Sequence, residues 1–114
     1  MHGMYGNLNP EKVFLNRDNT NTLQLQDDSQ ALGTLANSDL TAATKVGIQF
    51  DKLPSMYNSV DDPTVISFTP DGKVTLKLGS LNLPEGERTA YFVVYDGANP
   101  NGIRWTPDVI LTVV

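Results

Sequence analysis

The sequence predicts an all-β chain folded as an antiparallel sandwich of about seven short strands. Three observations support this class. Runs rich in β-branched and aromatic residues alternate apolar and polar positions, which is typical of half-buried strands. Turn-forming Gly, Pro, Asn and Asp recur between these runs. Good helix formers are few, whereas Thr, which favours strands, is frequent.

The clearest element is a β-hairpin over residues 88–114 at the end of the chain. Ala90, Phe92 and Val94 alternate with the residues between them, as expected of a strand with one face in the core. The segment 96–102, DGANPNG, is a turn, and residues 103–105 and 109–114 return as strand.

Shorter patterns predict the other elements in chain order. Strands are expected at residues 12–15, 22–26, 46–50, 65–68 and 74–78, separated by turns at 16–21, 27–30 and 69–72. Residues 31–35 are expected to form a short strand or an irregular segment. Ser38 or Asp39 is expected to cap a single helical turn. Residues 51–63 are expected to form a connection, with Met56 and Tyr57 packed on the sheet.

The chain has 114 residues, which suits one domain. We divide it into an N-terminal arm, residues 1–11, and a sandwich domain, residues 12–114. The arm is a candidate docking element, packed on its own domain or on a neighbouring chain, through His2, Met4, Tyr5 and Leu8. A terminal strand that completes its own sheet is the alternative.

Composition argues against several classes of partner. The net charge is −5, and the eight basic residues are scattered, whereas nucleic-acid binding needs clustered Lys and Arg. No apolar run approaches the roughly 20 residues of a membrane span, and the N-terminus lacks the pattern of a signal peptide. We therefore expect neither nucleic acid nor a membrane as a partner.

No catalytic or metal-binding pattern stands out, and we expect a non-enzymatic protein without a cofactor. There is no cysteine, and the single histidine is His2. The acidic positions Asp27-Asp28, Asp61-Asp62 and Asp71 do not follow the spacing of an EF-hand loop and are read as turn residues. A carboxylate pair for sugar hydrolysis depends on distances in the fold, so a small hydrolase stays open as a third class.

The hairpin loop is the first candidate for a contact surface, because binding residues commonly sit on loops held by a rigid scaffold. The candidate contact residues are Tyr95, Asp96, Asn99, Pro100, Asn101 and Trp105. Core packing is the favoured role of Trp105. In the alternative, an exposed Trp105 stacks on a sugar or a protein together with Tyr95 or Tyr57.

Several motifs resemble those of known families. The loop Leu83–Gly86 followed by Tyr91 resembles the corner of immunoglobulin-like domains, in which a tyrosine bonds back to the preceding loop. The order of four further motifs resembles small structural proteins of tailed bacteriophages and prophages. These motifs are VFLNRDN at 13–19, LQL at 23–25, DLTAATKV at 39–46 and VYDGANPNGIRW at 94–105.

The phage resemblance implies an immunoglobulin-like sandwich that serves in a virion assembled in the host cytoplasm. The implied role is a head decoration or head-fibre-type protein on the major capsid protein. The alternatives are a neck or tail accessory protein, or a carbohydrate-binding module for host-surface glycans. The resemblance implies no catalytic residue. Apart from it, a second copy of the chain, in a homo-oligomer, is a further candidate partner.

Overall fold

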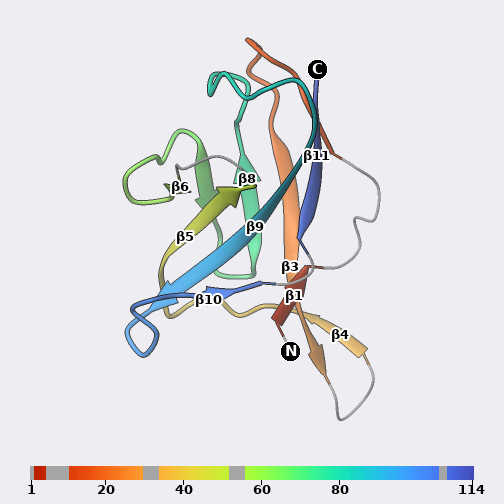
Figure 1. The fold of residues 1–114 in the computed structure, drawn as a ribbon. Coiled ribbons are helices and arrows are strands. Elements are labelled where there is room, and N and C mark those ends of the chain that lie inside the picture. The colour runs from red at the N-terminus through yellow and green to blue at the C-terminus, as the bar shows by residue number, and fades with distance from the viewer. Residues whose placement is uncertain (1, 5–10, 30–33, 52–55, 106–107) are drawn as a thin grey trace.

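The computed structural model describes residues 2–4, 11–29, 34–51, 56–105 and 108–114. This part of the chain is all β, as predicted, and the strands form two sheets (Figure 1). The described strands are β1 (His2–Met4), β2 (Glu11–Val13), β3 (Asn21–Ser29), β4 (Thr34–Asn37), β5 (Ala43–Phe50), β6 (Met56–Asn58), β7 (Ile66–Phe68), β8 (Lys73–Leu76), β9 (Gly86–Asp96), β10 (Ile103–Arg104) and β11 (Val109–Val113).

The strand order is that of an immunoglobulin-like sandwich. One sheet runs β1-β3-β8-β7, with β4 also paired to β3. The other runs β2-β11-β9-β5-β6, with β10 also paired to β9. The first sheet matches the A-B-E-D sheet of such domains, in which β1, β3, β8 and β7 take the places of A, B, E and D. The second matches the G-F-C-C′ sheet, in which β11, β9, β5 and β6 take the places of G, F, C and C′, and β2 is added at the edge beside β11.

The described part of the chain contains eleven strands, compared with about seven expected. β1 and β6 are each three residues long, too short for alternation to reveal them. The last strand is divided into β10 and β11, which pair with different parts of β9. The pair β2·β11 is parallel, an exception within a sandwich whose other strand pairs are antiparallel in the described residues.

The core lies between the two sheets and follows the predicted alternation. Phe92 and Val94 of β9 are buried beside Ile48 and Phe50 of β5, and Val74 of β8 is fully buried in the same cluster. Burying a side chain of this size contributes roughly 1.5–3 kcal/mol relative to leaving it exposed. These buried side chains anchor β9 in the core, and the loop to β10 projects from the end of this anchored strand.

Three local expectations are wrong in detail. Residues 27–29 were expected in a turn, but they continue β3 and pair with β4, since the strand runs on to Ser29. The Asp39 carboxylate accepts bonds from the backbone N–H and hydroxyl of Thr41, but the chain enters β5 at Ala43 without a helical turn. At the corner before β9, Arg88 rather than Tyr91 bonds back to the loop. Its guanidinium donates to the carbonyls of Pro84 at 3.3 Å and Glu85 at 3.0 Å.

The N-terminal strand β1 is hydrogen-bonded to β3, with His2 opposite Asp27 and Met4 opposite Leu25. This is the arrangement in which a terminal strand completes its own sheet. Of the candidate docking residues, Tyr5 and Leu8 lie outside the described residues. The prediction that the arm docks on a neighbouring chain stays a prediction.

Candidate contact surface

The loop between β9 and β10 is shaped by one carboxylate. Asp96 Oδ1 accepts the backbone N–H groups of Ala98 at 3.0 Å and Asn99 at 2.7 Å, and the side-chain amide of Asn99 at 3.0 Å. A side-chain oxygen that satisfies successive backbone donors is the usual way an Asp organises a turn. The loop therefore holds its own shape.

The end of the loop is packed against the outer face of its own sheet. Gly102 has a φ of +81° and donates its N–H to the Asn99 carbonyl at 3.0 Å. A Cβ at this position would lie 2.3 Å from Val93 Cγ1 and 2.8 Å from Tyr95 Cε1. Glycine is required here both by the backbone conformation and by the closeness of β9.

The outer face of the sheet formed by β5, β9 and β10 carries two pairs of a cation and an aromatic ring. Lys45 Nζ lies 4.5 Å from the centre of the Tyr95 ring. Arg104 Cζ lies 3.9 Å from the centre of the Tyr91 ring. The Tyr95 hydroxyl lies 3.3 Å from Met56 Sδ on β6, so this ring is held from two sides.

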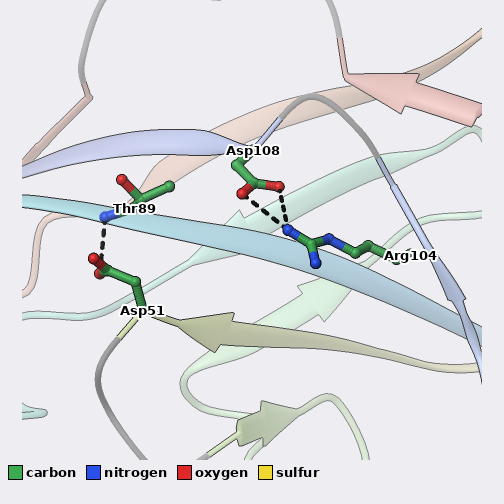
Figure 2. A network of polar contacts seen from close by, with 4 residues as sticks. All are labelled: Asp51, Thr89, Arg104 and Asp108. Atoms are coloured by element: carbon green, nitrogen blue, oxygen red, sulfur yellow. Dashed lines mark hydrogen bonds and ion pairs between the residues drawn. The ribbon is translucent and has the colours of Figure 1, made fainter.

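A salt bridge to Asp108 holds Arg104, the cation of the second pair, as Figure 2 shows. Arg104 Nη2 lies 3.0 Å from both carboxylate oxygens of Asp108. On the opposite side of β9, Asp51 Oδ1 accepts the backbone N–H of Thr89 at 3.1 Å and fixes the end of β5. Both Arg104 and Asp108 are partly solvated, so the ion pair contributes at most about 1 kcal/mol.

The predicted contact residues have different positions. Pro100 and Asn101 are exposed at the loop tip, whereas Asp96 and Asn99 are half-buried and bonded within the loop. Tyr95 lies half-buried on the outer face. Trp105 is only 4% exposed and belongs to the core, so its assignment as a contact residue is corrected.

Burial also removes the aromatic platform expected for sugar binding. Trp105 is in the core, and the Tyr57 ring packs edge-on against Phe50, with 6.3 Å between ring centres. One face of Tyr95 carries Lys45. Trp105 is therefore closed to a sugar, and the rings of Tyr57 and Tyr95 are partly covered.

Sequence reasoning missed Lys45, Arg104 and Met56 as parts of this surface. Alternation placed Lys45 on the wet face of its strand. Its contact with Tyr95 depends on the β5–β9 register, which shifts between Ala43 and Lys45 and thereby sets Lys45 opposite Tyr95. Such an irregularity has no signature in this sequence.

Two further observations concern chemistry and membranes. The described residues contain no group of three or more His, Cys, Asp or Glu side chains placed to hold a metal ion. Among the same residues, no helix has the length and apolar character needed to cross a bilayer.

Comparison with known proteins supports the fold. Neither the protein-family models nor the curated proteins give a match to this sequence. Among solved structures, the chain is similar to part of the endo-β-1,4-mannanase from Thermotoga petrophila, with a TM-score of 0.52 and 11% sequence identity. The match covers 99% of this chain and 19% of the mannanase chain, so this chain spans about a fifth of that protein. At this identity, the likeness shows a shared β-sandwich fold.

Proposed function

We propose that the protein is a non-enzymatic structural subunit of a tailed-phage particle, a head decoration or head-fibre-type protein that docks on the major capsid protein. One observation carries the proposal. The phage-like motif at residues 94–105 coincides with the loop whose shape Asp96 and Gly102 set. A loop held in one shape on a rigid scaffold is a common place for binding residues, so its exposed tip is the surface that we propose docks.

In this proposal the loop tip makes the first contact. Pro100 and Asn101 project from the self-bonded loop, which loses little conformational freedom on binding. The adjoining outer face adds Tyr91, Tyr95 and Arg104, residue types that are enriched at protein interfaces. Many copies on one lattice hold through avidity even where each contact is weak.

The N-terminal strand supplies a second means of docking. β1 is an edge strand of three residues that pairs with β3 alone in the described structure. Edge strands present backbone donors and acceptors that a neighbouring chain can pair with. A neck or tail accessory role uses the same surfaces and differs in the number of copies per particle.

The test is co-sedimentation of the purified chain with source particles that lack it. We expect the chain to sediment with the particles, and the number of bound copies separates a head lattice from the neck or tail. A protein that neither binds these particles nor occurs in purified wild-type particles does not have this function.

A pair of matched variants tests the loop. Pro100→Ala/Asn101→Ala removes both exposed tip side chains and is expected to reduce binding at least tenfold. Pro84→Ala/Asn19→Ala is the control, because both residues are exposed. They belong to the β8–β9 and β2–β3 loops, which lie at the other end of the sandwich from the β9–β10 loop (Figure 1). Equal binding by the two variants would show that the loop tip is not the contact.

The carbohydrate-binding alternative is tested in parallel. A stable monomer that does not bind the particles but binds a polysaccharide would favour that alternative. The half-exposed Tyr91 and Tyr95 would then be the residues to change first.

A further inference from the structure

We propose that Asn101, at the tip of the β9–β10 loop, is a site of spontaneous deamidation. Asn101 is the only asparagine in the sequence that is followed by glycine. Asparagine is among the thermolabile residues, and a glycine after it leaves the attacking peptide nitrogen unhindered because glycine has no Cβ.

The reaction needs only the chain and water. The Gly102 backbone nitrogen gives up its proton to a base and forms a bond to Asn101 Cγ. The Cγ–Nδ2 bond breaks and ammonia leaves, which closes a five-membered succinimide ring. Water then opens the ring at one of its two carbonyls and leaves either aspartate or isoaspartate at position 101. No oxidant or reductant takes part.

The local structure leaves the Asn101 amide available. Asn101 is exposed, and within the described part of the chain its side-chain amide makes no hydrogen bond. The Asn58 amide, by contrast, is bonded at both ends. Its nitrogen donates to Asp61 at 2.9 Å, and its oxygen accepts the N–H groups of Val60 at 3.0 Å and Asp61 at 2.9 Å.

The glycine that makes Asn101 reactive is fixed by the fold. Any side chain at position 102 would meet Val93 and Tyr95 and would need a positive φ. A substitution of Gly102 that slowed the reaction would therefore also distort the hairpin.

A hydrogen bond within the loop limits the rate of the reaction. The Gly102 N–H is donated to the Asn99 carbonyl at 3.0 Å, so the nitrogen must leave this bond before it attacks. Asn99 is itself held by Asp96. Loosening the loop at Asp96 should release the Gly102 nitrogen and speed the reaction.

The primary test is peptide mapping by mass spectrometry after the folded chain is kept at neutral and at mildly alkaline pH. We expect the mass gain of amide-to-acid conversion at Asn101, as aspartate and isoaspartate together, at least several-fold faster than at Asn58. Asn99 is an internal control, because the following Pro100 has no N–H to lose. Conversion at Asn101 no faster than at Asn58 would overturn the proposal.

Two variants test control by the loop. Asp96→Ala removes the acceptor and is expected to raise the rate several-fold, whereas Asp96→Ser retains an acceptor oxygen, creates no new Asn-Gly step and should stay nearer the wild-type rate. Equal rates in both variants would show that the loop bonds do not limit the reaction.

A functional consequence rests on the proposed function. Deamidation replaces the Asn101 amide with a carboxylate and so removes one of the two exposed side chains that we propose make the first contact. Aged protein bound to particles should therefore contain less converted Asn101 than the unbound fraction. Because the chemistry is measured on the isolated chain, failure of the chemistry and failure of the docking role are distinguishable.

Discussion

Lys45 and Tyr95 are opposite each other in the β5–β9 register, with the ammonium nitrogen 4.5 Å from the ring centre. The contact joins the two central strands of one sheet on its outer face. Tyr95 directly precedes Asp96, which shapes the loop that we propose as the docking tip. The contact therefore links the stability of the sheet to the position of that loop.

A double-mutant cycle measures this contact. Lys45→Gln and Tyr95→Leu each remove one partner, and we expect a coupling free energy of about 0.5–1 kcal/mol between them in denaturant unfolding. Lys73→Gln is the control, because Lys73 is on β8 in the other sheet and should combine additively with Tyr95→Leu.

Gly102 and Gly97 form a second matched pair in the same loop. We expect Gly102→Ala to destabilise the fold by about 2–4 kcal/mol, because the methyl group meets Val93 and the positive φ is unfavourable for alanine. Gly97→Ala should change stability by less than about 0.5 kcal/mol, since no atom lies within 4 Å of a Cβ there. Equal midpoints of thermal unfolding for the two variants would contradict this account.

Asp96 is predicted to hold the loop rather than to bind a partner directly. Asp96→Ala removes an acceptor used by three donors and should cost about 1–3 kcal/mol of unfolding free energy. Asn101→Ala at the exposed tip should leave stability unchanged. Chemical denaturation of both variants tests the distinction, and a stable Asp96→Ala protein would argue against it.

Two exposed carboxyl groups give the fold a dependence on acidic pH. Hydrogen bonds from Thr41 lower the pKa of Asp39 below 3.8, and the bond from the Thr69 hydroxyl lowers the pKa of Asp71 in the same direction. Because both pKa values are lower in the folded state, this stabilisation is complete well above pH 3.8. It is lost as the pH falls below 3.8 and through the folded-state pKa values.

Threonine variants separate the two sites. Thr41→Val should raise the pKa of Asp39 toward 3.8 and leave Asp71 unchanged, and Thr69→Val should do the reverse. Carboxyl titration by NMR gives each value directly. An unchanged pKa of Asp39 in Thr41→Val would show that the Thr41 hydroxyl is not the cause.

Trp105 provides a spectroscopic test of the corrected assignment. At 4% exposure its fluorescence should be that of a buried indole, poorly accessible to a soluble quencher, and should not respond to added polysaccharide. A solvent-exposed emission spectrum that shifts with a glycan would restore the stacking role.

The elements that could be predicted from the sequence are those in which the apolar or polar character of each residue matches the buried or exposed position of its side chain. Alternation predicted β9 and the buried faces of Val46 and Val74, because side chains in a strand point to opposite faces in turn. It also favoured the core for Trp105, which the structure confirms.

Features that depend on two segments far apart in the chain were not predictable in this way. The parallel pairing of β2 with β11 and the contact of Lys45 with Tyr95 both depend on register or on a local irregularity. Propensity describes single positions, whereas register is set by the packing of the whole sheet.

The self-bonded loop has a practical consequence for protein engineering. The side chains of Ala98, Pro100 and Asn101 are exposed, while the bonds that shape the loop come from Asp96, Asn99 and backbone groups. These three positions could be randomised together to select new binders without disturbing the frame. The absence of cysteine means that such a library could be produced in a reducing cell and labelled afterwards at a single introduced thiol.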